Sequence, residues 1–362
     1  MKRILQELRK NPVFWLLPLA PVALVAEHYA PEAHTQLFFL SISAIVPLAT
    51  LLGRSTEAVA ARTGDTIGGL LNASLGNLPE LIIGLAALRA GMFDLVKASM
   101  AGAIVAATLF MFGTALLLGG LRHHVQEYNR AGAMLQVSML LLATVTLFVP
   151  SAMSGVEELQ ASRYMEHLSI GLSVLLIASY ALGLVFSLGT HREVFAARGG
   201  GSAHEEKPWP VRAAVVALAV ATVLIALVSE VFVDSVQKAA EQLGMSPAFV
   251  GFVVVALAGA APGLMTAASA ARKNRLDMAV GISMGSAAQN ALFVAPVLAL
   301  ASYALAPSPM TLTFTLGQVF VVFISMITAS IVASTGRSAW YTGVQLIAIY
   351  LVFAITLYLL PA

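Results

Sequence analysis

The chain has 362 residues, of which 59% are hydrophobic and 10% are charged, with a formal net charge of +2. Its mean hydropathy is +0.87. So small a polar fraction cannot cover the surface of a soluble globule, so we predict a chain surrounded by a lipid bilayer, with no nucleic-acid partner. The absence of cysteine excludes disulfides, thiolate metal sites and a cysteine nucleophile.

Eleven mainly apolar runs follow one another along the chain, each close to the roughly 20 residues with which a helix crosses about 30 Å of hydrocarbon. They lie near residues 13–29, 34–53, 66–88, 94–120, 131–151, 167–189, 211–230, 247–271, 277–304, 311–334 and 338–361. The runs lack the alternation of barrel strands, and an open strand edge cannot satisfy its backbone in lipid. We therefore predict an all-α polytopic membrane protein with about eleven transmembrane helices. The first run follows a basic start but shows no evident cleavage site before Glu27, so we interpret it as a retained helix rather than a signal peptide.

Lysine and arginine are unevenly distributed between the loops. If the N-terminus lies inside, sixteen of the twenty basic residues fall in inner segments. Basic residues favour the cytoplasmic ends of spans, which predicts a cytoplasmic N-terminus and an outer C-terminus. No transit peptide is evident, and a prokaryotic inner membrane is the simplest location.

The sequence contains an internal repeat, in which residues 68–110 and 251–293 superimpose at a constant offset of 183. Matched positions include Gly76 with Gly259, Pro79 with Pro262, and Glu80 with Gly263. The copies begin at the third and eighth predicted spans, so five crossings separate them and they must point in opposite directions. An inverted repeat with interrupted helices is typical of secondary transporters that bind their substrate near the midplane.

These observations divide the chain into four parts. We expect an N-terminal transmembrane helix at 1–30, a first five-helix repeat at 31–195, a cytoplasmic linker at 196–210 and a second five-helix repeat at 211–362. The chain has no phosphate-binding glycine loop, which argues against ATP-driven pumping.

Glu80 is the acidic residue that lies deep within a predicted span, whereas the other seventeen of the eighteen can be placed in loops or near span ends. Carboxylates inside membranes usually have a function, although a neutral or hydrogen-bonded core residue is the alternative. Pro79 frees a carbonyl one turn back, and Asn77 lies on the same helical face as Glu80. Since calcium prefers carboxylate, amide and carbonyl oxygens, we predict Glu80, Asn77 and Asn72 as cation ligands.

The second copy offers neutral polar residues instead. Ser286, Gln289 and Asn290 are candidate ligands. For Thr266 and Ser283 we favour a structural role, because hydroxyls in membrane helices usually bond to their own backbone. Glu57 and Glu230, near span ends, could attract cations on a peripheral path, although ordinary interfacial charge is the alternative.

The stretch IGGLLNASLGNLPELI at 67–82, together with GSAAQ at 285–289 and ALFVAP at 291–296, resembles the calcium/proton exchanger branch of the cation/calcium exchanger superfamily. The resemblance covers nearly the whole chain. It implies one helix followed by two five-helix repeats, and antiport in which a glutamate from each repeat binds calcium and protons in turn. In this resemblance Glu80 matches the first of these glutamates, which implies that it is the proton-coupling group. Asn77 matches the family's preceding asparagine, and Gln289 matches the glutamine of the second repeat.

The chain departs from the family pattern at the site itself. Gly263 stands where the second glutamate is expected, and Ala107 stands where the family usually has asparagine. Asn290, at the repeat position of Ala107, is also unusual for the family, but here the departure adds a polar side chain instead of removing one. The linker, often strongly acidic in the family, contains Glu205 and Glu206.

The leading hypothesis is a secondary antiporter that exchanges calcium for protons, with calcium binding weakened by Gly263. One carboxylate neutralises half of a divalent ion, so a monovalent cation/proton antiporter is an alternative, as is a non-transporting homologue or a disabled variant. A single glutamate forms no catalytic constellation, so we expect no enzyme activity and no cofactor beyond the transported calcium ion and protons. The sequence is compatible with a monomer or a homo-oligomer.

Overall fold

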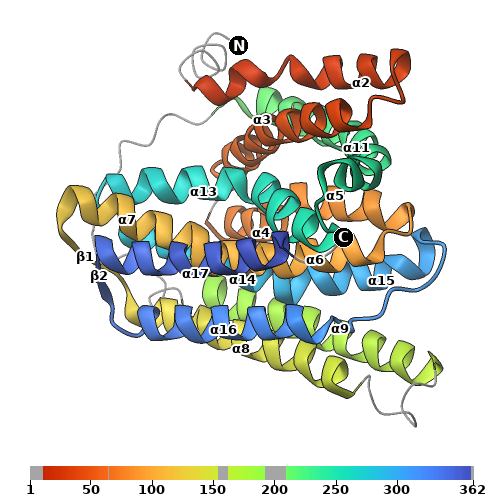
Figure 1. The fold of residues 1–362 in the computed structure, drawn as a ribbon. Helices are drawn as coiled ribbons and strands as arrows, with labels where there is room; N and C mark the ends of the chain where they lie inside the picture. The colour runs from red at the N-terminus through yellow and green to blue at the C-terminus, as the bar shows by residue number, and fades with distance from the viewer. Residues whose placement is uncertain (1–10, 64, 154–161, 192–208, 360–362) are drawn as a thin grey trace.

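The computed structural model describes residues 11–63, 65–153, 162–191 and 209–359 (Figure 1). Most of the predicted linker, with Glu205 and Glu206, lies outside the described residues. In chain order the elements are η1 Pro12–Leu16, α2 Leu19–Tyr29, α3 His34–Ala60, α4 Asp65–Leu75, α5 Leu78–Arg89, α6 Phe93–Val105, η2 Ala106–Met111, α7 Phe112–His123, β1 Val125–Glu127, α8 Arg130–Met153, α9 Ser162–Val185, η4 Phe186–Thr190, α11 Val211–Leu243, α12 Pro247–Phe249, η5 Val250–Val255, α13 Ala256–Arg272, α14 Leu276–Gln289, η6 Asn290–Val294, α15 Ala295–Leu305, α16 Leu316–Ala333, β2 Arg337–Ala339 and α17 Trp340–Tyr358. The predicted all-α membrane architecture is confirmed.

Ten stretches of helix in the described residues are long and apolar enough to cross a membrane, and they coincide with ten of the eleven predicted spans. The remaining predicted span, 66–88, is divided into the shorter helices α4 and α5. Large hydrophobic side chains such as Trp15, Leu182 and Ile331 are exposed on the flanks of the molecule, as a lipid-facing surface requires.

The break between α4 and α5 falls at Gly76 and Asn77, directly before Pro79 in the first turn of α5. The amide of Gly76 still donates to the carbonyl of Asn72 at 2.8 Å. The next helix, α5, starts at Leu78 with Pro79 as its second residue. Proline is tolerated in this first turn because its missing amide hydrogen has no acceptor there. The interruption predicted for the first copy of the repeat is therefore present, whereas in the second copy α13 continues past Pro262 without a break.

The helices α3 and α11 lie side by side and run antiparallel at one side of the molecule, with α2 beside them (Figure 1). Phe38 near the start of α3 stacks on Phe232 in the second half of α11, with ring centroids 5.8 Å apart. The hydroxyl of Thr35 bonds to Gln242 at the same end of the pair. Each helix precedes its own copy of the repeat, so their antiparallel packing agrees with an inverted relationship between the copies.

The copies pack against each other through glycines in the centre of the molecule. A Cβ atom added to Gly102 in α6 would lie 2.2 Å from the carbonyl oxygen of Phe252 in η5. The backbones therefore approach too closely for any larger residue at this position. The π-helical turns η2 and η6 follow α6 and α14 at matching places in the two copies, since residues 107–111 correspond to 290–294.

A small antiparallel sheet of two strands joins two loops at one end of the molecule. This sheet was not predicted from the sequence. Strand β1 pairs with β2 through Gln126 opposite Ser338, and the carboxamide of Gln126 donates to the carbonyl of Ala271 at 3.1 Å and to Asn274 at 2.8 Å. The strands have three residues each, so they leave no periodic signal, and tertiary contacts rather than propensity hold them.

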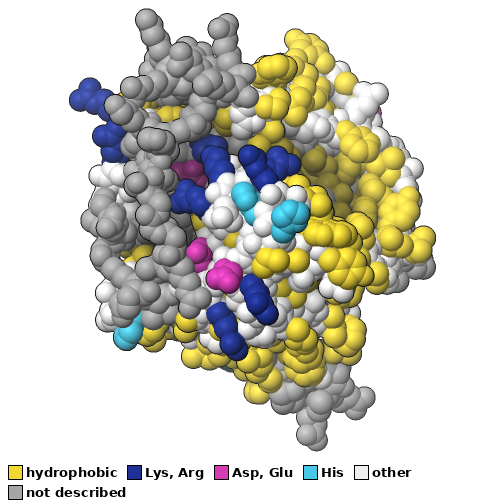
Figure 2. Space-filling view, turned by 90° about the vertical axis from the view of Figure 1, so that its left-hand side faces the viewer, with side chains coloured by type: hydrophobic (Ala, Val, Ile, Leu, Met, Phe, Trp, Pro, Cys, Tyr) yellow, Lys and Arg dark blue, Asp and Glu magenta, His cyan; other side chains and the backbone are white. Residues whose placement is uncertain are grey.

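The same end carries a cluster of basic side chains in the face turned toward the viewer in Figure 2. The loops that meet there contribute Arg122, Arg130, Arg272, Lys273 and Arg337. All five belong to segments that the charge distribution assigned to the inner side. We name this the basic end; its cytoplasmic location stays a prediction.

Candidate functional site

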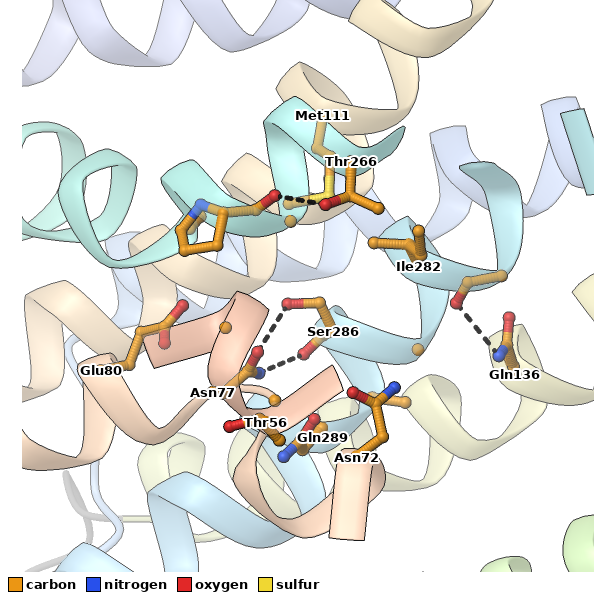
Figure 3. A pocket seen from close by; sticks show the side chains of 18 of the residues that line it. Thr56, Asn72, Asn77, Glu80, Met111, Gln136, Thr266, Ile282, Ser286 and Gln289 are labelled. Carbon is orange, nitrogen blue, oxygen red and sulfur yellow. Dashed lines mark hydrogen bonds between the residues drawn. The ribbon is translucent and has the colours of Figure 1, made fainter. Parts of the chain in front are cut away.

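A pocket of about 530 Å³ lies between the two copies of the repeat and α3. Its wall includes six of the predicted residues, namely Glu57, Asn72, Asn77, Glu80, Ser286 and Gln289. Figure 3 shows five of these side chains around the break between α4 and α5, namely Asn72, Asn77, Glu80, Ser286 and Gln289. The wall also includes Ser187 after α9 and Met278 near the start of α14, so the pocket extends from Glu80 toward the basic end.

Glu80 lies in the first turn of α5, where the positive end of the helix dipole favours an acidic side chain. Its Oε2 atom is buried and has no hydrogen-bond partner among the described residues. An ionised carboxylate buried in this way costs several kcal/mol, so the group needs a proton or a cation. Gly259 of the second copy makes room for it, because a Cβ atom there would lie 2.7 Å from Cγ of Glu80.

Asn77 connects the two copies at the break. Its Nδ2 donates to the carbonyl of Ser286 at 3.2 Å, and the hydroxyl of Ser286 donates to Oδ1 of Asn77 at 3.2 Å. The two residues therefore form a reciprocal pair between the first copy and α14. The lone pairs that remain on Asn77 Oδ1 and Ser286 Oγ are neutral oxygen ligands of the kind that calcium accepts.

Gln289 enters the same pocket from the end of α14. Its Oε1 atom lies 3.3 Å from the position of a Cβ on Gly76, so the side chain packs directly against the α4–α5 break. Its Nε2 atom is buried without a partner among the described residues. Asn72, one turn before Gly76, is exposed and borders the pocket.

Two further predicted residues are not brought into the pocket. Asn290 is 2% exposed and both atoms of its carboxamide lack partners within the described part of the chain, but it does not belong to the pocket wall. Glu230 lies on α11, exposed, with an oxygen 3.8 Å from a guanidinium nitrogen of Arg89. The structural roles predicted for Thr266 and Ser283 agree with their bonds to the carbonyls one turn back, at 3.0 and 2.9 Å.

Position 263, where the second glutamate was expected, also borders the pocket. A Cβ on Gly263 would lie 3.0 Å from Cε and 3.6 Å from Sδ of Met111, the last residue of η2. The thioether therefore lies where a longer side chain at 263 would begin. Within the described residues, no group of three or more His, Cys, Asp and Glu side chains could hold a metal ion.

Thr56 is a pocket residue that the sequence interpretation missed. It lies on α3 with Gly53 and Glu57, at spacings of three and four residues that put all three on one helical face. The adjacent Glu57 was singled out for its charge. The same periodicity, applied to its neighbours, was the available signal for Thr56.

The sequence model of the sodium/calcium exchanger protein family matches residues 33–189 and 213–359 of this chain. The chain belongs to this family. A Ca(2+)/H(+) antiporter of Aphanothece halophytica is 34% identical over 368 residues, covering 98% of each chain. The Ca(2+)/H(+) antiporter ChaA of Bacillus subtilis is 36% identical over 353 residues, covering 97% of this chain and 100% of the relative.

Solved structures agree with this assignment. Native YfkE superimposes with a TM-score of 0.83 at 32% identity, covering 96% of this chain and 100% of that one. The H+/Ca2+ exchanger CAX superimposes with a TM-score of 0.73 and covers 97% and 88% of the two chains. Because the two sequences are 17% identical, this structural likeness supports the shared fold alone. The resemblance read from the motifs at 67–82 and 285–296 is confirmed.

Proposed function

We propose that this protein is a secondary antiporter that exchanges calcium for protons by alternating access between its two inverted repeats. The observation that carries the proposal is the Glu80 carboxyl group in a pocket between the copies, whose buried Oε2 has no hydrogen-bond partner among the described residues. A carboxyl group in this position can be neutralised by a proton or by a cation, and binding of one displaces the other. The curated relatives named as Ca(2+)/H(+) antiporters support calcium as the cation.

In this proposal calcium enters from the basic end past Glu57, whose side chain is 44% exposed beside Arg54 at the pocket. It is then held by the Glu80 carboxylate together with neutral oxygens of Asn77, Ser286 and Gln289. Asn72 borders the same path. Glu230, in the second half of α11, is proposed to meet cations outside the pocket. These ligands come from both copies, so rocking of the segments 31–195 and 211–362 against each other would expose the ion to alternate sides.

The charge at the site suggests how many protons are exchanged. Among the described pocket residues Glu80 is the buried carboxylate, and Gly263 supplies no second one. One carboxyl group binds one proton, so each calcium ion is exchanged for one proton through Glu80, and each cycle moves net charge. The same observation favours a monovalent cation as the second candidate substrate, because one carboxylate neutralises it fully.

Calcium uptake into proteoliposomes under an imposed pH gradient tests the proposal. We expect uptake that stops when a protonophore collapses the gradient, and we expect Glu80→Gln to lower it to the level of empty liposomes. Glu127→Gln is the matched control, because Glu127 is an exposed carboxylate on β1 outside the pocket. Retention of uptake and of its pH dependence by Glu80→Gln would overturn the role of Glu80; uptake of sodium or potassium but not calcium would select the second candidate.

A further inference from the structure

Hydroxyl groups on α3 normally bond to the backbone of their own helix. Thr50 donates to the carbonyl of Val46 at 2.9 Å, and Ser55 donates to the carbonyl of Leu51 at 2.7 Å. This is the usual behaviour of Ser and Thr in membrane helices, since no water is available to them. Thr56, the next residue after Ser55, does not follow it: its buried Oγ1 atom has no partner within the described part of the chain.

The side chain of Thr56 is directed at the pocket rather than at lipid or at the helix backbone. The residue is 1% exposed and forms part of the pocket wall. Figure 3 shows its side chain at the pocket with Gln289 and Asn77. A buried hydroxyl that makes no hydrogen bond destabilises the protein, so its presence calls for a group that it meets in another state.

Two more buried polar atoms that have no hydrogen-bond partner in the described part of the chain line the same pocket. They are Oε2 of Glu80 on α5 and Nε2 of Gln289 on α14. Together with Thr56 Oγ1, they bring unsatisfied polar groups from three helices to one cavity. Within the described residues such atoms also occur elsewhere, but in this pocket three of them line one wall, and one of the three is a carboxyl oxygen.

We propose that the Thr56 hydroxyl oxygen is a ligand of the transported calcium ion, supplied by α3. This inference rests on the proposed function and deepens it by adding a ligand from outside the two copies at 68–110 and 251–293. Calcium takes six to eight oxygen ligands. Among the described pocket residues Glu57 is exposed and Glu80 alone has a buried carboxylate oxygen, so a larger share of these ligands must be neutral. A hydroxyl on α3 adds one that the motif residues do not provide. Ligation by Thr56 also makes the position of α3 depend on whether calcium is bound.

The test compares Thr56→Val, which keeps the side-chain shape and removes the hydroxyl, with Thr56→Ser, which keeps the hydroxyl. Thr50→Val is the matched control, because Thr50 lies on the same helix with its hydroxyl bonded to Val46. Loss of one neutral ligand should raise the calcium KM of uptake, and the Kd for calcium of the purified protein, by about five- to tenfold in Thr56→Val. Thr56→Ser and Thr50→Val should stay within about twofold of the unmodified protein.

Thermal unfolding in detergent separates ligation from a structural role. Thr56→Val removes an unsatisfied hydroxyl, so its Tm in the absence of calcium should be equal to or above that of the unmodified protein. The increase in Tm on adding calcium should be smaller in Thr56→Val. A lower calcium-free Tm with unchanged KM and Kd would show that Thr56 is structural and overturn the inference.

The outcomes also distinguish this inference from the proposed function. If the unmodified protein binds and transports calcium and Thr56→Val does so with the same KM and Kd, the Thr56 inference fails and the proposed function stands. If the unmodified protein neither binds nor transports calcium, both fail together.

Discussion

The contact between Gly259 and Glu80 gives a prediction whose magnitude follows from the structure. A Cβ atom at position 259 would lie 2.7 Å from Cγ and 3.0 Å from Cδ of Glu80. Non-bonded carbon atoms pack at about 3.5–4.0 Å, so Gly259→Ala creates an overlap of roughly 1 Å. Either the Glu80 side chain leaves its place or α13 moves away from α5. Overpacking of this kind costs about 1–3 kcal/mol.

We expect this cost to appear in calcium binding, because the displaced atoms belong to the proposed ligand. At about 1.4 kcal/mol per factor of ten, Gly259→Ala should raise the calcium Kd and the KM of uptake by roughly 5- to 150-fold. The assay is calcium binding to the purified protein, followed by uptake into proteoliposomes. Thermal unfolding, measured in parallel, reports how much of the cost affects the whole fold.

Two other glycines provide the comparison. Gly171→Ala on α9 is the neutral control, because a Cβ atom there would meet nothing within 4 Å. Gly263→Ala should have a smaller effect than Gly259→Ala, because its Cβ would meet the flexible end of Met111 at 3.0 Å. Equal calcium affinities for Gly259→Ala and Gly171→Ala would refute the claim that Glu80 binds calcium in the position it occupies against Gly259.

Three more substitutions separate the parts of the account. Gly263→Glu adds a carboxyl group beside Met111. We expect the number of protons exchanged per calcium ion to rise from one to two, as measured from the reversal of transport at set pH gradients and membrane potentials. An unchanged ratio would place residue 263 outside the cation path. Ser286→Ala removes one hydrogen bond to Asn77, worth about 1 kcal/mol, and should raise the calcium KM about fivefold, whereas an unchanged KM would show that the pair is structural. Gln126→Leu on β1 removes two hydrogen bonds at the basic end, one of them to Ala271, which lies twelve residues after Gly259 on α13. It should lower stability by about 1–3 kcal/mol in thermal unfolding with the calcium KM unchanged; a large shift in KM would show that this end controls the site.

The spans and the deep carboxylate could be predicted from the sequence because both depend on the cost of placing polar groups in hydrocarbon. That cost makes apolar runs long and makes a single buried Glu80 conspicuous. The break before Pro79 was also readable, because proline cannot donate the hydrogen bond that a continuous helix needs. Pro262, at the matching position, shows the limit of this rule, since α13 continues past it.

The parts that could not be predicted depend on contacts between distant segments. Asn290 follows Gln289 directly, yet Gln289 borders the pocket and Asn290 does not, because the packing of α14 and η6 against α6 and η2 decides which side chain reaches the pocket. Thr56 carries no charge and breaks no apolar pattern. That its hydroxyl has no hydrogen-bond partner among the described residues becomes visible in three dimensions alone. The position of Met111 beside Gly263 likewise depends on how η2 packs against α13.

Equilibrium binding of calcium to the purified protein across the acid pH range tests the central claim most directly, namely that calcium and one proton compete for Glu80. The account predicts that the calcium Kd rises about tenfold for each pH unit that the solution is made more acidic, as competition with one proton requires. It also predicts that any calcium binding left in Glu80→Gln has lost this dependence. A calcium Kd that does not change with pH, or the same pH dependence in Glu80→Gln, would contradict the account.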